Sequence, residues 1–263
     1  MKIDVCVKQV PASNETRLDP VTHTILRNGA GSILNPFDTY AVEEALRIKE
    51  SCGGTITAFS MGIPAAKEML RRVLELGVDH AVLLTDRAFA GSDTLATART
   101  LAAAVASDGM PDLILCGRMA TDGDTAQVGP MLAETLGIPH VSDVAAIEEI
   151  TEEAAVIRRL TDYGYVRLRV RFPALLTVLK EINNPRLPSL SGILDAEDAE
   201  IDVLDHEVLR LDPARTGLSG SATRVVATER PVQERKAEIL SGSPEEQADA
   251  LIRRLRSAGM ISD

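Results

Sequence analysis

The stretch Cys116–Pro130, CGRMATDGDTAQVGP, decides how the whole chain is interpreted. It follows Pro111–Leu115, an apolar run typical of a buried parallel strand, and it precedes Met131–Gly137, which has the pattern of a helix. The stretch is therefore predicted to be the loop between a strand and a helix. In an open α/β sheet this is where nucleotides bind, because the free N–H groups at a helix N-terminus face the phosphate.

The residues of this loop leave two interpretations open. The loop has neither the Gly-Lys-Ser/Thr ending of a P-loop nor a G-x-G-x-x-G turn, so no standard nucleotide motif identifies it. Its carboxylates, hydroxyls and glycines suit a nucleotide site. They also suit a tight polar turn in which Gly123 and Gly129 serve only the backbone geometry.

Composition argues against several classes of function. The chain has 263 residues and a formal net charge of −11, which argues against a general nucleic-acid binder. No signal peptide is visible at Met1–Lys8 and no run approaches a membrane span, so we expect a cytoplasmic protein without membrane insertion. Cys6, Cys52 and Cys116 are unclustered and predict reduced thiols rather than metal ligands. A nucleotide-hydrolysing enzyme would need a phosphate-loop signature and catalytic cations, and we find neither, so no catalytic residue is assigned.

Strand and helix patterns alternate through the first half of the chain. The predicted strands are Ile3–Val10, Thr55–Ser60, His80–Leu84 and Leu113–Cys116, and the predicted helices are Asn35–Glu50, Ala65–Leu76 and Thr94–Ala106. Repeated βα units predict an α/β fold with a Rossmann-like parallel sheet. Further strands, predicted at Val144–Ile150, Ala155–Leu160, Tyr165–Phe172 and Ala174–Leu179, indicate an antiparallel or mixed extension.

The chain changes character after Lys180. Asn183–Gly192 is rich in helix breakers and is predicted to be a loop. Residues 195–240 lack periodicity, which predicts an extended arm that lies on a partner; the alternative is that the arm folds back on its own sheet. Ser243-Pro244 begins a helix that ends at Gly259 and carries a narrow apolar stripe. We therefore divide the chain into a nucleotide-binding α/β domain, 1–180, and a region with a recognition loop, a partner-wrapping arm and a terminal helix, 181–263.

Four segments in chain order together resemble the β subunit of an electron-transfer flavoprotein. They are VKQVP at Val7–Pro11, LNPFD at Leu34–Asp38 before AVEEAL at Ala41–Leu46, the loop Gly117–Pro130, and Pro173–Leu190. The similarity runs from about Met1 to Gly259. It implies an adenine-nucleotide α-hydrolase-like fold and an obligate heterodimer with an α subunit that carries a redox flavin. In this family the β subunit binds AMP in many members and FAD in electron-bifurcating members.

The resemblance implies a nucleotide site at strand ends and helix starts. The implied cofactor-binding residues there are Cys6, Val7, Lys8, Asn35, Asp38, Met61, Gly117, Asp122, Gly123, Asp124, Thr125, Ala126, Gln127, Val128 and Gly129. Backbone groups of Cys6 and Val7 suit an adenine edge, and the N–H groups from Ala126 to Gly129 suit phosphate. For Asn35-Pro36, a plain helix start is the alternative.

Other residues resemble the FAD-binding, bifurcating branch of the family. Gly123 stands where AMP-binding members more often carry an acidic residue, and its lack of a charge would suit a diphosphate. Two more segments, Asp86–Thr97 and Ser221–Arg224, resemble that branch, although Ala222 departs from it. They add to the implied site Arg87, Gly91, Ser92, Asp93, Thr94, Thr97, Thr223 and Arg224. An N-cap of the following helix is the alternative for Asp93. Met119 and Thr121 also depart from the pattern.

The bifurcating branch implies a set of electron donors and acceptors. NADH would be the donor. The acceptors would be ferredoxin or flavodoxin and, through the α-subunit FAD, an acyl-CoA dehydrogenase or similar flavoprotein. The alternative is a non-bifurcating β subunit that binds AMP structurally and docks the dehydrogenase. Leu187 and Leu190 in the recognition loop would contact that dehydrogenase, unless they pin the loop to its own core.

Overall fold

The computed structural model describes residues 1–263 except 13–16, 19–24, 27–30, 228–236 and 263, and gives only the backbone of 17–18 and 25–26. The chain forms two compact units, Met1–Val226 and Ala227–Asp263.

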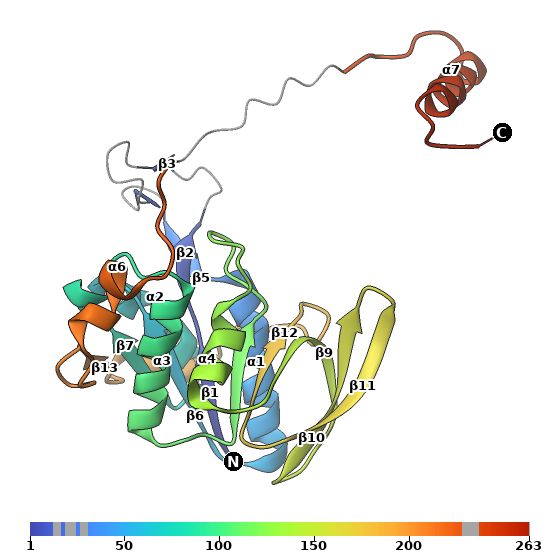
Figure 1. Cartoon of the computed structure of the whole chain (residues 1–263). Helices are drawn as coiled ribbons and strands as arrows, with labels where there is room; N and C mark the ends of the chain where they lie inside the picture. The colour runs from blue at the N-terminus through green and yellow to red at the C-terminus, as the bar shows by residue number, and fades with distance from the viewer. Residues whose placement is uncertain (13–16, 19–24, 27–30, 228–236, 263) are drawn as a thin grey trace. The chain divides into compact units, whose positions relative to one another are not determined.

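A nine-stranded sheet forms the centre of the first unit, in the order β11-β10-β9-β12-β8-β1-β6-β7-β13 (Figure 1). Its strands are β1 Lys2–Cys6, β6 Thr55–Met61, β7 His80–Leu84, β8 Leu113–Gly117, β9 His140–Ile150, β10 Ala154–Thr161, β11 Gly164–Arg171, β12 Ala174–Val178 and β13 Asp202–Leu204. In this spatial order, every neighbouring pair in the part β9-β12-β8-β1-β6-β7-β13 is parallel. β10 is antiparallel to both β9 and β11. The predicted parallel sheet with a mixed extension is confirmed.

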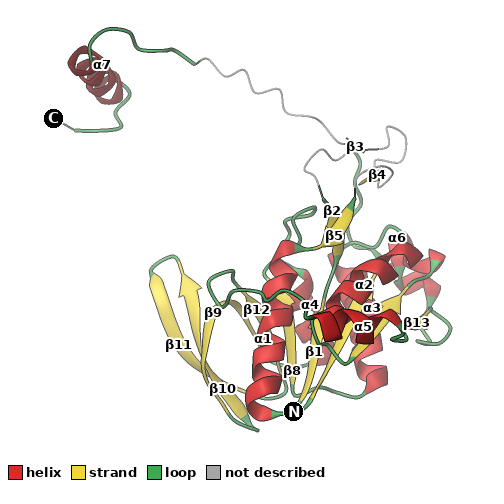
Figure 2. Ribbon diagram, turned by 180° about the vertical axis from the view of Figure 1, so that it is seen from behind, coloured by secondary structure: helices red, strands yellow, loops and turns green. Residues whose placement is uncertain are grey.

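Helices cover both faces of this sheet. They are α1 Pro36–Cys52, α2 Lys67–Glu75, α3 Thr94–Asp108, α4 Val128–Leu136, α5 Leu190–Glu197 and α6 Gly217–Gly220, with short 3-10 turns η1 Pro64–Ala66, η2 Arg87–Phe89 and η3 Pro213–Arg215. α1 and α2 pack on one face and α3 and α4 on the other (Figures 1 and 2). β1 serves both layers because its side chains alternate, with Ile3 and Val5 toward α1 and Cys6 toward α3.

The first predicted strand is wrong in extent. Ile3–Val10 is not one strand, because β1 ends at Cys6. The chain then enters β2, Gln9–Pro11, which pairs antiparallel with β5, Ser32–Leu34, outside the main sheet. Two further short strands, β3 Arg17–Leu18 and β4 Ile25–Leu26, pair with each other. The apolar pattern continues past Cys6, but the backbone leaves the sheet at the point where the site begins.

The predicted extended arm is wrong for its first part. α5 packs on α2, and β13 pairs with the edge of β7. Leu204 and Leu209 then pack against the core under α3. This segment can pack on the sheet with only a few apolar residues, because the open edge of β7 supplies its backbone hydrogen bonds. We refer to Asp202–Thr223 as the strap.

The second unit contains α7, Pro244–Ser257. Its predicted start is confirmed: Ser243 and Glu246 form a capping box, and Pro244 occupies the first turn. No residue of α7 is buried, and Leu251 and Ile252 on its apolar stripe are 49% and 41% exposed. The part of the predicted arm at 228–236 lies outside the described residues.

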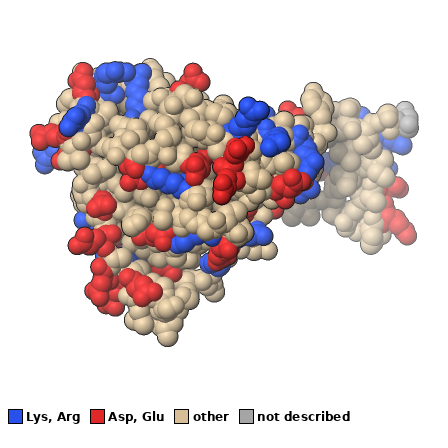
Figure 3. Space-filling model, turned by 90° about the horizontal axis from the view of Figure 1, so that it is seen from below, with Lys and Arg blue, Asp and Glu red and all other residues tan. Residues whose placement is uncertain are grey.

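Charged side chains of both signs occupy the surface of the molecule. On the face seen in Figure 3, Asp and Glu side chains are interspersed with Lys and Arg side chains, and a group of Asp and Glu side chains lies at the lower left. Among the described residues, no helix is both long and apolar enough to cross a membrane.

Candidate functional site

The candidate site lies at the point where the strand order of the sheet reverses. β1 lies between β6 and β8, and the chain leads from β1 toward α1 on one face but from β8 into α4 on the other. The carboxyl ends of these parallel strands share one edge, which points away from the N-terminus in Figure 1. In open α/β sheets a crevice opens where neighbouring connections diverge in this way, and ligands bind there. We call it the β1–β8 crevice.

The base of the loop after β8 is closed by the start of α1. A Cβ at Gly117 would lie 2.4 Å from Asp38 Oδ1, so only glycine permits this approach. The buried Asp38 carboxylate accepts a hydrogen bond from Lys8 N–H at 2.7 Å, and burial raises the pKa of Asp38 to about 7. Asn35 makes no N-cap bond; its amide donates to Met119 O at 2.9 Å and accepts from Thr121 N–H at 3.2 Å. Asn35 and Asp38 therefore hold the loop, and their contact with a base or ribose stays a prediction.

An ion pair fixes the next part of the loop. Lys8 Nζ lies 2.6 Å from Asp122 Oδ1, and the Asp122 side chain is only 5% exposed. The ammonium group therefore offsets the negative charge of Asp122 next to the predicted phosphate position.

The tip of the loop differs from its base. Gly123–Gln127 is exposed, and Asp124 and Ala126 have φ angles of 49° and 52°, in the left-handed region that non-glycine residues rarely adopt. Such strain persists only where surrounding structure or function requires it. Val128 begins α4, and Gln127 makes no side-chain cap bond to the first N–H groups of that helix.

Gly123 and Gly129, the two glycines that a simple polar turn would require for its backbone geometry, have different roles. A Cβ at Gly129 would lie 2.7 Å from Thr177 Cγ2, so Gly129 is required for packing against β12. A Cβ at Gly123 would meet nothing within 4 Å, and its φ lies outside the left-handed region. Within the described residues, no fold requirement explains the glycine at 123.

The second predicted segment reaches the loop through α3. Thr94 Oγ1 donates to Gln127 Oε1 at 2.9 Å. Asp93 caps α3 through Ala96 N–H at 2.9 Å, as the alternative proposed, but its other oxygen accepts from Thr223 N–H at 2.8 Å. Burial alone would raise the pKa of Asp93, yet these hydrogen bonds lower it below its usual value. Segments 130 positions apart in sequence, at Asp93 and Thr223, therefore meet at one place.

The remaining predicted residues are distributed around this meeting point. Met61 ends β6, Gly91 adopts φ 74° before α3, and Ser92 Oγ donates to Phe89 O at 2.8 Å. Arg87 and Arg224 are exposed. Cys6 and Cys116 are buried and face each other in the β1–β8 register, and contact with the Cys116 thiol, followed by burial, raises the pKa of Cys6.

Sequence reasoning missed one contact beside the site. Asp86 Oδ2 accepts a hydrogen bond from His206 N–H at 3.2 Å and lies 2.5 Å from His206 Nδ1. The hydrogen bond from His206 lowers the pKa of Asp86 to about 2. The signal available was a histidine between two acids, Asp205 and Glu207, in a segment without periodicity.

The recognition loop is fastened to α1. Arg186 Nε lies 2.8 Å from Glu43 Oε2, and Asn183 donates to Tyr40 O at 3.0 Å. Leu187 and Leu190 are 88% and 75% exposed, so the alternative in which they pin the loop to its own core is wrong. The loop is shorter than predicted, because Ser189 caps α5 and the helix begins at Leu190.

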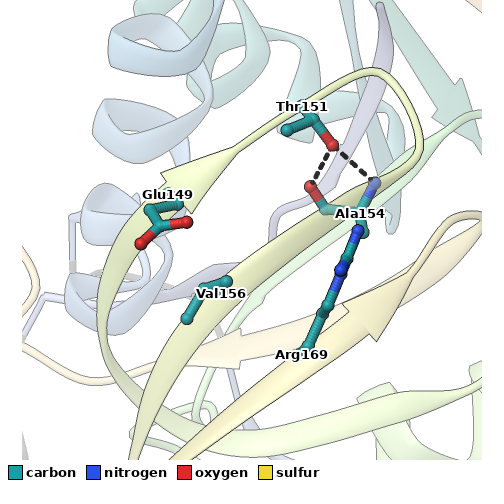
Figure 4. Close-up of a pocket in the computed structure, with 5 residues that line it drawn as sticks. All are labelled: Glu149, Thr151, Ala154, Val156 and Arg169. Atoms are coloured by element: carbon teal, nitrogen blue, oxygen red, sulfur yellow. Dashed lines mark hydrogen bonds between the residues drawn. The ribbon is translucent and has the colours of Figure 1, made fainter.

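A small pocket in the sheet extension is separate from this site. It has a volume of about 130 Å³ and is lined by Glu149, Thr151, Ala154, Val156 and Arg169 (Figure 4). The Thr151 hydroxyl is already bonded to the backbone of Ala154. Ligand pockets usually exceed about 300 Å³, so this one is too small for a nucleotide.

The open parallel sheet, with a loop and a helix start at its reversal point, defines an α/β protein with a Rossmann-like sheet. Residues 22–209 match the electron transfer flavoprotein domain family. Electron transfer flavoprotein subunit beta of Thermoanaerobacterium thermosaccharolyticum is 47% identical over 262 residues, covering 99% of this chain and 100% of the relative. Caffeyl-CoA reductase-Etf complex subunit CarD of Acetobacterium woodii is 44% identical over 263 residues, with 99% and 100% coverage. Acryloyl-CoA reductase electron transfer subunit gamma of Anaerotignum propionicum is 38% identical over 269 residues, with the same coverage. The chain belongs to the electron transfer flavoprotein family as a β subunit, and its role is in electron transfer.

Proposed function

We propose that this β subunit binds FAD at the β1–β8 crevice and takes part in flavin-based electron bifurcation. The observation that carries the proposal is the meeting of three segments: the loop after β8, Gly91–Thr97 and Ser221–Arg224. Thr94 joins the first two at 2.9 Å, and Asp93 joins the last two at 2.8 Å. A site built from all three is longer than the phosphate of a mononucleotide requires, which favours a dinucleotide.

The described residues fit the diphosphate of such a ligand. Backbone N–H groups at the end of the strained tip and at the start of α4 would bind the phosphates, and Gly123 adds neither bulk nor charge there. Lys8 offsets the carboxylate of Asp122. Thr125, Ala126 and Gln127 would surround the phosphates from the exposed side.

The segments beyond the loop would hold the ring end of the cofactor. The hydroxyl of Thr94 donates to Gln127 and that of Thr223 donates to Asp93, so each would accept a hydrogen bond from the cofactor, and Arg87 and Arg224 offer cations at exposed positions. When bound, FAD supplies electron-transfer chemistry, and the protein supplies position and electrostatics. The residues of this chain would therefore bind and orient the cofactor, and none is assigned a proton-transfer step.

We further propose an obligate heterodimer with an α subunit in the cytoplasm. Val226 and Ile239 are 86% and 92% exposed, and the stripe of α7 is uncovered within its own unit. Apolar surface of this kind usually marks an interaction site. NADH is the proposed donor, and ferredoxin or flavodoxin the first acceptor. The reductase names of the relatives, built on caffeyl-CoA and acryloyl-CoA, support an acyl-CoA dehydrogenase-type protein as the second acceptor.

The test of the cofactor proposal is to co-express the chain with its α subunit, denature the purified complex and identify the released nucleotides by chromatography. Two FAD per heterodimer is the expected result. One FAD and one AMP would overturn the proposal and support the non-bifurcating alternative.

The docking proposal concerns Leu187 and Leu190. The exposed side chain of Leu187 lies in the loop that Arg186 fastens to α1, and that of Leu190 lies at the start of α5, so a partner can bury both without disturbing the fold. Truncating a leucine buried at an interface removes roughly 1.5–3 kcal/mol, so Leu190→Ala should lower the affinity for the dehydrogenase at least tenfold while flavin content stays unchanged. Val208→Ala, at a position 61% exposed on the strap, is the matched control. Equal effects of the two variants would contradict a specific docking role.

A further inference from the structure

The strap follows the β7–α3 connection, residues 85–93, from one end to the other. β13 pairs with β7, and Thr85 N–H donates to Leu204 O at 3.1 Å. Further along, Leu218 N–H donates to Ala90 O at 2.9 Å. The strap ends where Thr223 N–H reaches Asp93. In Figure 1 it is the orange segment that runs from β13 to α6 beside β7 and α3.

Asp86 is a charged residue of the β7–α3 connection that contacts the strap. Its Oδ1 accepts from Ala88 N–H at 2.9 Å and so caps η2, while its Oδ2 lies 2.5 Å from His206 Nδ1 and 3.2 Å from His206 N. The side chains of His206 and Asp86 are 27% and 17% exposed. One carboxylate therefore ties the connection and the strap together ahead of the contacts at Ala90 and Asp93.

We propose that His206 is a positioning residue of the cofactor site: paired with Asp86, it fixes the strap on the β7–α3 connection and thereby sets Thr223 and Arg224 beside Asp93. This inference rests on the proposed FAD site, to which it adds a residue without cofactor contact. Fixing the strap reduces the conformational freedom of Ser221–Arg224 before the ligand arrives, which favours binding.

The charges around His206 give this pairing a pH dependence. Within the described residues, the charged groups that raise the pKa of His206 are Asp86 across the contact and Asp205 and Glu207 on its own turn. The hydrogen bond to Asp86, the largest cause, raises the pKa of His206. The pairing is therefore fully present below the ordinary pKa of histidine and is lost as pH rises through the raised value. Because the pKa of Asp38 is also raised, to about 7, only the difference between wild type and variant isolates His206.

The test uses the heterodimer with His206→Gln, His206→Lys and, as a matched control, His80→Gln at the exposed amino end of β7. FAD affinity and the amide hydrogen-exchange protection of Thr223 and Leu218 are measured from pH 6 to pH 9. At low pH, His206→Gln should lower both by about two- to fivefold, the range of a partly exposed ion pair. The variant should equal wild type at high pH. His206→Lys, charged throughout, should keep protection nearly constant, and His80→Gln should match wild type.

Each failure has its own signature. Unchanged exchange protection in His206→Gln would overturn the role of His206 in fixing the strap. Lower protection with unchanged FAD affinity would make His206 structural only and would also overturn the proposal. Absence of FAD from the wild-type heterodimer would instead overturn the proposed function.

Discussion

The two edges of the parallel sheet carry the same residue types in different arrangements. At the amino edge, Asp112 accepts from Lys2 N–H and Asp79 from Ile56 N–H, both at 2.8 Å. Each of these carboxylates accepts a hydrogen bond from a backbone N–H group at the start of a strand. At the carboxyl edge, Asp38 and Asp122 close the base of the loop after β8 in a similar way. The exposed tip beyond them has backbone strain at Asp124 and Ala126.

This difference distinguishes polar residues that stabilise the fold from polar residues that are placed to bind a ligand. A carboxylate at the amino edge completes its hydrogen bonding within the chain. The two left-handed residues of the tip cost on the order of 1–3 kcal/mol each, and the hydrogen bond from Asp124 N–H to Ala120 O lies within the same turn. The stable base holds the strained tip in place, which is the arrangement expected of a preorganised binding loop.

The largest effect should come from the base of the loop. Gly117→Ala would place a Cβ 2.6 Å from the backbone carbon of Phe37, which cannot move without shifting the start of α1. We expect a loss of at least about 3 kcal/mol in unfolding free energy, measured by urea denaturation. Gly123→Ala is the control and should change stability by less than about 0.5 kcal/mol, because its Cβ meets nothing within 4 Å. Similar losses in both variants would remove the distinction between base and tip.

Sequence patterns predicted the loop itself, but not that its base is held by structural contacts while its tip is exposed and strained. The apolar run before Cys116 and the helical pattern after Pro130 place the loop at a strand end, because local periodicity is sufficient for that, although α4 begins earlier, at Val128. The requirement for glycine at 117 arises from contact with Asp38, far away in sequence, and no local pattern encodes it. The strap was missed for a similar reason. β13 is a short strand whose place depends on the uncovered edge of β7 rather than on its own propensity.

The second prediction concerns Asp4, the middle residue of β1. Its side chain is fully buried, and its carboxyl oxygens make no hydrogen bond within the described residues. Burial raises the pKa of Asp4 to about 7. Between about pH 4 and pH 7 the folded state therefore holds a proton that the unfolded state releases, so stability falls as pH rises through this window.

Asp4→Val should remove this dependence. Raising the pKa of Asp4 to about 7 in the folded state corresponds to roughly 4 kcal/mol of unfolding free energy, and local relaxation should reduce this to on the order of 2 kcal/mol. The variant should exceed wild type by that amount at pH 8 and by much less at pH 4, measured as unfolding free energy. Asp38 titrates in both proteins, so its effect cancels in the difference. A constant difference across this pH range would show that Asp4 does not titrate in the folded state.

The third prediction tests the tip directly. Gly123→Asp adds a carboxylate at an exposed position with room for it, so stability should stay within about 0.5 kcal/mol of wild type. Repulsion of the bound diphosphate should lower the nucleotide affinity about tenfold, and the loss should shrink in high salt. Gly123→Ala separates the effect of charge from that of bulk. Unchanged affinity in the aspartate variant would mean that the phosphates bind elsewhere.

The smallest effect should come from a pair of matched lysines, one at each edge. Lys8 contacts Asp122 and Lys49 contacts Asp79, both at 2.6 Å, but the Asp122 side chain is 5% exposed and the Asp79 side chain 30%. Lys8→Gln leaves a nearly buried carboxylate without its cation beside the tip. It should cost about 1 kcal/mol of stability and lower nucleotide affinity about threefold. Lys49→Gln should cost only a few tenths of a kcal/mol, because Asp79 is better hydrated and keeps its bond from Ile56 N–H, and affinity should not change. Titration calorimetry on both variants measures the affinities, and hydrogen exchange at the Gly123 amide reports loop order. If Lys49→Gln weakens nucleotide binding as much as Lys8→Gln, the amino edge contributes to the site and the contrast between the two edges fails.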